Sequence, residues 1–143
     1  MLSSLLKGSA RFISLRQAEV CFLSSNILSK RLFTTWLSDS QEYQTKSEQF
    51  LLDLDEKLEG IDELVPDSDV ILSQGVLTAE LGSKGTYVIN KQSPNKQIWL
   101  SSPLSGPKHF NYDTESKQWL DADDTNLLEL LKKEFKQLIN YNL

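Results

Sequence analysis

Carboxylates are concentrated in one stretch of this 143-residue chain, and a dense array of carboxylates is the first feature that could do chemistry. Residues 39–80 contain twelve acids and two lysines, a net charge of −10, whereas residues 1–38 carry +4 and residues 81–143 carry +1. Carboxylate oxygens suit hard or borderline cations such as Fe²⁺, Mn²⁺, Ca²⁺ and Mg²⁺. Charge runs usually only solvate a helix face, so the charge alone leaves a solvated surface and a site for cations or a basic partner equally open.

The N-terminal segment has the composition of a targeting sequence. Residues 1–38 are rich in Ser, Leu and Arg, and Glu19 is their only acid, which is typical of a mitochondrial transit peptide. We therefore expect residues 1–40 to be a transit peptide, cleaved or disordered, and residues 41–143 to form one domain. The alternative is a disordered or membrane-surface N-terminal arm.

Few of the usual enzyme residues remain outside that segment. Cys21 is the only cysteine, so a mature chain would have no thiolate for a disulfide, a zinc site or a nucleophile. His109 is the only histidine, which excludes a two-histidine metal site within one chain. No apolar run is long enough to predict a membrane span. The net charge of −9 in residues 39–143 argues against nucleic-acid binding.

The acids are positioned by a predicted helix. Apolar residues recur at helical spacing through residues 41–64, and Pro66 follows, so we expect a helix from about Gln41 to Leu64. Asp55, Glu59 and Glu63 stand four residues apart on its outer face, where like charges destabilise a helix by a few tenths of a kcal/mol. That cost favours a binding role over solvation alone.

After Pro66 the hydrophobic period becomes that of strands. Expected strands cover 70–73 and 76–81 (one strand, or a bulged pair around Gly75), 86–91, 96–101, 108–112 and 117–121. The cluster Asp123–Thr125 is expected to cap a second helix. The fold class is therefore α+β, a two-layer sandwich with two helices on one face of an antiparallel sheet of about five to six strands. The other sheet face would be open to water.

Alternation along two strands predicts what the open face carries. Tyr87 and Ile89 share the helix side of one strand, as Ile98 and Leu100 do on the next. The open side would then carry Val88, Asn90, Gln97 and Trp99, with Gln92 nearby. A tryptophan among amides is typical of a partner-binding surface, although a tryptophan half buried under a loop fits equally well.

The stretch Gly85–Pro107, reading GTYVINKQSPNKQIWLSSPLSGP, resembles the core of the frataxin family, and the resemblance covers about residues 41–141. It implies a frataxin-like fold and a protein of the mitochondrial matrix that acts in iron–sulfur cluster assembly. Such proteins bind Fe²⁺ and Fe³⁺ on an acidic ridge. They dock on the complex of cysteine desulfurase with its scaffold protein and promote sulfur transfer and iron supply.

Carried onto this chain, the resemblance implies two sets of site residues. Weakly bound, exchangeable iron would be held by Glu48, Asp55, Glu56, Glu59, Asp62, Glu63, Asp67 and Asp69, which we call the acidic ridge. The partner would be bound by Asn90, Gln92, Gln97, Trp99, Pro107, Lys108 and His109. The resemblance also implies a monomer that could form oligomers with iron.

Two alternatives to this accessory function are open at this point. One is a ferroxidase and iron-storage protein that oxidises Fe²⁺ to Fe³⁺, since clustered carboxylates favour Fe³⁺. No catalytic residues are assigned for it, because the Glu-x-x-His motif of the bundle ferroxidases is absent. The other is an acidic interaction module without a physiological metal.

Overall fold

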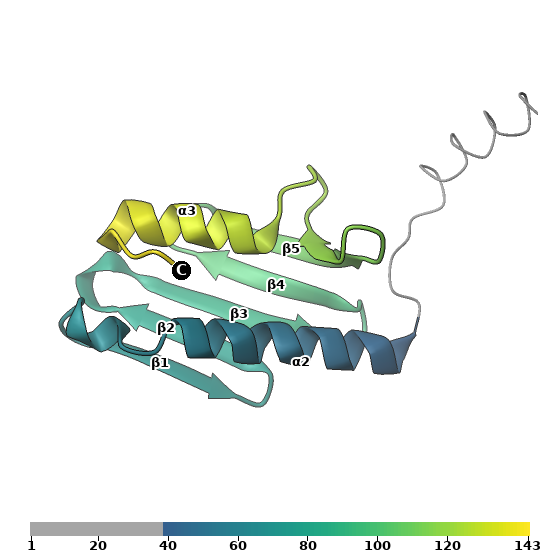
Figure 1. Ribbon diagram of the computed structural model, residues 1–143, viewed down its shortest axis with the longest axis horizontal. Helices are drawn as coiled ribbons and strands as arrows, with labels where there is room; N and C mark the ends of the chain where they lie inside the picture. Colours follow the sequence, from purple (N-terminus) through teal and green to yellow (C-terminus); the bar gives the residue numbers. More distant parts are fainter. Residues whose placement is uncertain (1–38) are drawn as a thin grey trace, which may run out of the picture. The chain divides into compact units, whose positions relative to one another are not determined.

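The computed structural model describes residues 39–143, and residues 1–38 of the predicted transit peptide lie outside them. Figure 1 shows a sheet with two helices laid along it. The helices are α2 (Ser40–Lys57) and α3 (Leu127–Ile139), and the 3₁₀ turns are η1 (Ile61–Glu63) and η2 (Gly82–Lys84). The strands are β1 (Ser68–Ser73), β2 (Val76–Leu81), β3 (Thr86–Gln92), β4 (Gln97–Ser102), β5 (Gly106–Asp113) and β6 (Gln118–Leu120).

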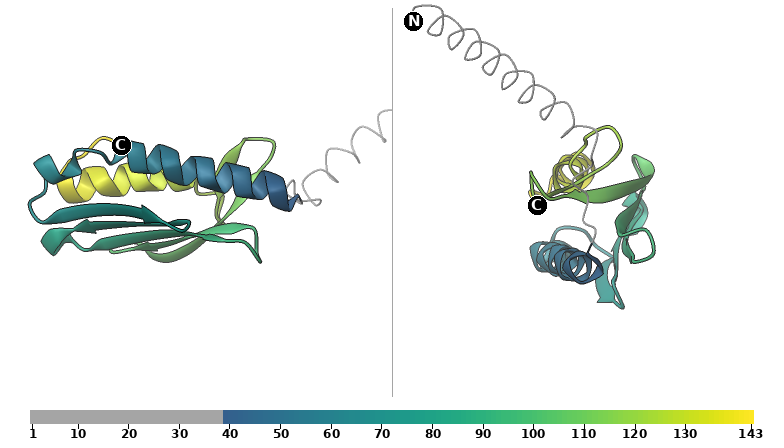
Figure 2. Two further views of the ribbon diagram at one scale, coloured as in Figure 1. Left: turned by 90° about the horizontal axis from the view of Figure 1, so that it is seen from below. Right: turned by 90° about the vertical axis from the view of Figure 1, so that its right-hand side faces the viewer.

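The predicted fold class is confirmed. The six strands form one antiparallel sheet in the order β1-β2-β3-β4-β5-β6, so each strand pairs with its neighbour in the sequence. Both helices lie on the same side of this sheet (Figure 2, left). No described segment covers the opposite side, which we call the open face.

The first helix is shorter than the sequence predicts. It begins where the Asp39 side chain accepts a hydrogen bond from the Gln41 backbone N–H at 2.8 Å. It ends at Lys57, not Leu64, because Gly60 adopts a left-handed backbone (φ 79°) and the chain continues as η1. Ile61 on η1 still packs into the core, at 2% exposure. The apolar pattern therefore continues past the end of the helix, and the predicted helix boundary at Leu64 was wrong.

The first two strands form a hairpin and not one bulged strand. Gln74 and Gly75 connect β1 to β2, and both have positive φ values (50° and 77°). Positive φ at both loop residues is typical of a two-residue hairpin turn, because the twist of such a turn matches the twist of the strands on either side. Ser73 pairs directly with Val76 across this turn.

The core lies between the sheet and the two helices. Tyr87, Ile89, Ile98 and Leu100 are at most 2% exposed, which confirms the predicted alternation. Tyr87 stacks on Phe135 of α3 at 4.7 Å between ring centroids. Burying such aromatic side chains stabilises a fold of this size substantially. These side chains on the helix side of the sheet therefore form the core and are buried from partners.

The second helix begins later than predicted. Its N-cap is Asn126, whose side chain accepts a hydrogen bond from Glu129 N, and not the cluster Asp123–Thr125. Asp121 organises the preceding turn instead, because its Oδ1 accepts hydrogen bonds from the backbone N–H groups of Asp123 and Thr125. Within residues 39–143, no helix combines the length and the apolar character that crossing a bilayer requires.

Candidate functional site

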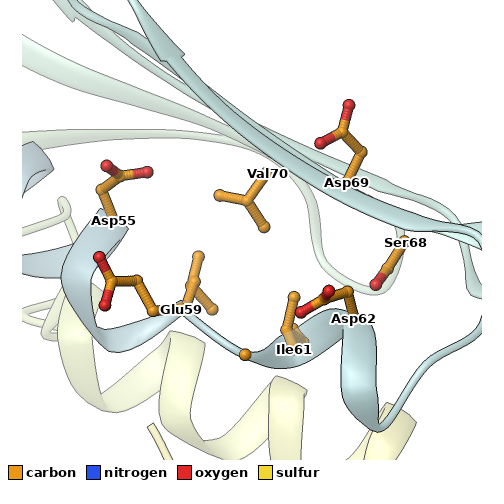
Figure 3. Close-up of a pocket in the computed structure, with 9 residues that line it drawn as sticks. Asp55, Glu59, Ile61, Asp62, Ser68, Asp69 and Val70 are labelled. Carbon is orange, nitrogen blue, oxygen red and sulfur yellow. The ribbon is translucent and has the colours of Figure 1, made fainter.

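Part of the acidic ridge surrounds a cleft where α2, η1 and β1 meet. This cleft, which we call the acidic hollow, has a volume of about 350 Å³. Asp55 and Glu59 lie on one side, Asp62 lies on the other, and Val70 stands between them (Figure 3). Asp55 is half-buried, whereas Glu59 and Asp62 are exposed. The hollow therefore gathers carboxylates from α2 (Asp55), from the turn that follows α2 (Glu59) and from η1 (Asp62).

Asp69 stands apart from this group. Side chains alternate along β1, so Asp69 points to the side of the sheet opposite Ser68 and Val70. Figure 3 shows its carboxylate directed away from those of Asp55 and Glu59. Its cross-strand neighbour is Glu80, another exposed acid. Asp69 thus adds negative charge at the rim of the acidic hollow but does not point into it.

Glu48 is neutralised by a lysine of the sheet. Lys91 Nζ lies 2.7 Å from Glu48 Oε1 and also donates to Gln44 Oε1 at 3.2 Å. The Lys91 stem crosses Gly75, where an added Cβ would come within 2.5 Å of Lys91 Cε. Lys91 is thereby directed at α2, so Glu48 is ion-paired and has less free charge than the rest of the acidic ridge.

The other acidic-ridge residues are exposed and spread along the surface. These are Glu56, Glu63 and Asp67. Within the described residues, no group of three or more His, Cys, Asp or Glu side chains is close enough to hold a metal ion. An ion would have to draw the carboxylates together or bind through water, so this arrangement suits weak, exchangeable binding of a hard cation.

The open face carries the predicted partner-binding residues in ordered rows. Strand register places Ser73, Val76, Asn90, Trp99 and His109 side by side from β1 to β5. The next row joins Gln92, Gln97 and Asn111. Pro107 lies on the same side of β5 as His109. Six of the seven residues implied by the family resemblance therefore share one surface.

Trp99 is held in place although no helix covers it. Its ring is half-buried and stacks on the His109 ring with 4.4 Å between centroids and 28° between planes. Its indole N–H donates to Gln97 Oε1 at 2.9 Å, and Gln97 Nε2 donates to Asn111 Oδ1 at 3.1 Å. These contacts fix the orientation of a large amphipathic side chain at the centre of the open face.

Lys108 lies on the helix side of β5, away from the open face. Its Nζ is 2.8 Å from Asp121 Oδ2, and Asp121 is 6% exposed. Burial works to raise the pKa of Asp121, but hydrogen bonds from Lys108 and from the backbone N–H groups of Thr125 and Asp123 outweigh it, so the pKa is lowered. The hydrogen bond to Asp121 raises the pKa of Lys108. This pair links β5 to the turn before α3.

Two residues of these surfaces, Asn111 and Lys91, were not predicted from the sequence. Asn111 extends the open-face network and could have been found from alternation, since Pro107, His109 and Asn111 occupy every second position. Lys91 shares the helix side of β3 with Tyr87 and Ile89, and the same alternation places it there. Its partner Glu48 is 43 residues away, and no local pattern reveals such a pairing.

The sequence of this chain is similar to a known family and to named proteins. Residues 37–141 match the family described as "Frataxin-like domain". A protein named "Frataxin, mitochondrial" from Caenorhabditis elegans is 42% identical over 114 residues, which cover 77% of this chain and 84% of that protein. The protein of the same name from Dictyostelium discoideum is 57% identical over 72 residues, which cover 50% of this chain but only 37% of that protein.

A solved structure shows a similar fold. It is a crystal structure of trimeric frataxin from the yeast Saccharomyces cerevisiae, complexed with ferrous iron. The TM-score is 0.58 at 44% sequence identity, and the match covers 67% of this chain and 87% of the yeast chain. The match therefore extends over about two thirds of this chain and most of a protein that was crystallised with iron.

Proposed function

Because the chain belongs to the frataxin family, we propose that it is an iron-binding accessory protein of mitochondrial iron–sulfur cluster assembly. In this proposal the open face docks on the complex of cysteine desulfurase with its scaffold protein and promotes sulfur transfer to the scaffold. The acidic ridge holds exchangeable iron. Support comes from relatives named mitochondrial and from the yeast relative crystallised with ferrous iron.

The observation that carries the docking proposal is the position of Trp99. A tryptophan that folding had used for the core would be sealed beneath a helix, as Trp119 is at 4% exposure. Trp99 instead stands half-exposed on the open face, oriented by His109 and Gln97. Rigid aromatic side chains that need little further ordering are typical centres of protein interfaces. Asn90, the cross-strand neighbour of Trp99, adds a polar group beside it.

The iron-holding proposal rests on unneutralised charge. Of the ion pairs formed between described residues, one includes a member of the acidic ridge, namely Glu48. The carboxylates of Asp55, Glu59 and Asp62 therefore keep their negative charge available around the acidic hollow. Such a site attracts a cation without enclosing it, which suits a protein that receives iron and passes it on.

The docking proposal is tested by sulfide production from the desulfurase–scaffold complex. We expect Trp99→Ala and Asn90→Ala to lose most of the stimulation that the unchanged chain gives, because both residues lie in the central row of the open face. Thr86→Ala is the matched control, since Thr86 is exposed on the same side of β3 but two rows away. Full stimulation by both central variants would refute the docking proposal.

The iron proposal is tested separately by titrating Fe²⁺ under anaerobic conditions while recording backbone amide resonances. We expect broadening for residues 55–69 and little change for residues 86–92, which lie on the sheet away from the acidic hollow. Glu48 should respond weakly because Lys91 already neutralises it. Unchanged spectra at millimolar Fe²⁺ would favour an acidic interaction module without metal.

A further inference from the structure

The two edges of the sheet differ in how their backbone groups are covered. β6 has three residues, and its Leu120 forms a bridge with Asn126 of the segment that follows. β1 at the other edge has six residues, and β2 is its only neighbour among the described strands (Figure 1). An uncovered edge strand offers backbone N–H and C=O groups to which another extended chain can hydrogen-bond.

β1 lacks most of the features by which edge strands avoid such pairing. Lysine, proline or a bulge commonly protects an edge. β1 reads SDVILS and pairs with β2 without interruption from Ser68 to Ser73. Three consecutive apolar residues occupy its centre, and Ile71 is 54% exposed. Asp69 is its only charged residue.

Two hollows lie beside β1 on the side that α2 covers. The acidic hollow lies beside Val70 and is lined by Asp55 of α2 and by Glu59 of the turn that follows α2 (Figure 3). An apolar hollow of about 270 Å³ lies farther along the strand beside Leu72, and Leu52 at its rim is 55% exposed. The residues that line the apolar hollow are Glu48, Leu51, Leu52, Leu72, Gly75 and Lys91.

The spacing of the two hollows fits the repeat of an extended chain. Val70 and Leu72 are two positions apart on the same side of β1. Side chains on one side of a strand repeat every two residues, roughly 6.8 Å. A chain added beside β1 would therefore direct two successive same-side residues toward the acidic hollow and the apolar hollow.

We propose that the β1 edge binds an extended peptide segment of another protein in which a basic residue and an aliphatic residue stand two positions apart. The segment would add a seventh strand to the sheet through backbone hydrogen bonds to β1. Its basic side chain would enter the acidic hollow, and its aliphatic side chain would enter the apolar hollow. This site is distinct from the open face, so it stands or falls independently of docking through Trp99.

Charge favours such a partner over a second copy of this chain. Pairing two β1 strands would bring together two segments that each carry −10 over residues 39–80. Like charges at that density oppose association, whereas a basic segment is attracted. The basic residue also gives the site its direction, because the acidic hollow lies at one end of the strand and the apolar hollow at the other.

The test uses the full chain and synthetic peptides of seven residues in which every position other than Arg and Ile is Thr. Two peptides contain Arg-Thr-Ile or Ile-Thr-Arg, which covers both strand directions. A control of the same composition places Arg next to Ile, so that the two side chains point to opposite sides. A second control has N-methyl groups on alternate backbone nitrogens. Binding is measured by NMR titration together with hydrogen exchange of the β1 amides.

We expect one of the two spaced peptides to bind at least about tenfold more tightly than the adjacent-residue control, with slower exchange of β1 amides. The N-methylated peptide should not bind, because it cannot complete the backbone hydrogen bonds. Absence of binding, or equal binding by the N-methylated peptide, would overturn the proposal. Slow β1 exchange that depends on the concentration of the chain alone would also overturn it, in favour of a second copy.

Substitutions at exposed positions then assign the two hollows without threatening the fold. Glu59→Lys should weaken the Arg peptide about tenfold and should strengthen a peptide with Glu in place of Arg. Leu52→Asp should weaken binding of the Arg peptide and of the Glu peptide alike, because it places a charge at the rim of the apolar hollow. Glu115→Lys, in the turn between β5 and β6, is the matched charge control and should bind as the unchanged chain does. Equal affinities for all these variants would overturn the assignment.

Discussion

The open face and the acidic ridge are both exposed, but their side chains are organised very differently. On the open face, Trp99 is stacked on His109 and hydrogen-bonded to Gln97, so its orientation is fixed before any partner arrives. On the acidic ridge, Glu59 and Asp62 have no described ion-pair partner. The part of the open face around Trp99 is held by stacking and hydrogen bonds, whereas most carboxylates of the acidic ridge have no ion-pair partner among the described residues.

This difference indicates what each surface can contribute. An ordered aromatic surface loses little entropy on binding, so it supports specific docking. Unneutralised carboxylates act at longer range, because they attract cations and basic surfaces whatever their detailed shape. We therefore assign specificity to the open face and long-range attraction of cations and basic surfaces to the acidic ridge.

The largest expected effects separate the two tryptophans. Trp119 is 4% exposed and contacts Tyr43 and Tyr112, so Trp119→Ala should lower the free energy of unfolding by about 3–5 kcal/mol. Trp99→Ala should lower it by less than about 1 kcal/mol but should weaken docking by about 2–4 kcal/mol, roughly 30-fold or more. Urea unfolding and affinity for the desulfurase–scaffold complex measure the two effects. Equal destabilisation by both variants would make Trp99 a core residue.

The next effect defines the boundary of the open face. Lys108→Met leaves Asp121 buried without its cation, so we expect the free energy of unfolding to fall by about 1–3 kcal/mol. Docking should be unchanged, because Lys108 faces the helix side of β5. His109→Ala is the matched comparison and should show the reverse, weaker docking with little loss of stability. Weaker docking by Lys108→Met at unchanged stability would return Lys108 to the open face.

The same pair predicts a pH dependence. Asp121 has a lowered pKa in the folded chain, so its contribution is present above the unfolded pKa of about 4 and is lost as the pH falls through the folded pKa. Lys108 has a raised pKa, so its contribution is present below the unfolded pKa of about 10.5 and is lost as the pH rises through the folded pKa. Urea unfolding of the unchanged chain and of Lys108→Met should therefore converge at both extremes of pH. A constant difference would contradict the pair's role.

A smaller effect distinguishes two members of the acidic ridge. Glu48→Gln breaks the pair with Lys91, so it should lower the free energy of unfolding by about 0.5–1 kcal/mol and leave Fe²⁺ binding nearly unchanged. Glu59→Gln relieves repulsion from Asp55, so it should preserve stability and weaken Fe²⁺ binding. Calorimetric titration measures the affinity of each variant for Fe²⁺. Equal losses of Fe²⁺ affinity would show that Lys91 does not neutralise Glu48.

The smallest effect concerns association kinetics. Removing charge with Asp55→Asn and Glu59→Gln should slow association with the desulfurase–scaffold complex by about two- to threefold at low salt and leave it unchanged at high salt. Trp99→Ala should instead accelerate dissociation at every salt concentration. Stopped-flow measurement over a salt series separates these rates, and a salt-independent loss in the charge variant would contradict the steering role.

The sheet was predictable because its signal is local. Alternation alone separated Tyr87 and Ile89 from Asn90, since a period of two residues fixes which side each side chain takes. The helix end was not predictable from spacing, because Ile61 reaches the core from a 3₁₀ turn in the position that a helical residue would occupy. A single glycine at position 60 carried the correct signal.

The site was only partly predictable because its charges are balanced over long distances. Glu48 looked like its acidic neighbours, and only the fold brings Lys91 of β3 against α2. Lys108 follows Pro107 in the sequence, yet alternation turns it toward Asp121 and away from His109. Residue type therefore indicated which groups are charged, and the tertiary structure determined which charges remain free.

Hydroxyl-radical footprinting of the full chain, alone and bound to the desulfurase–scaffold complex, tests docking through the open face most directly. We expect oxidation of Trp99 and His109 to slow several-fold in the complex, whereas Leu64, which is 61% exposed beside η1, continues to be oxidised. Oxidation of Trp99 and His109 at the same rate in the bound and the free chain would contradict docking through the open face.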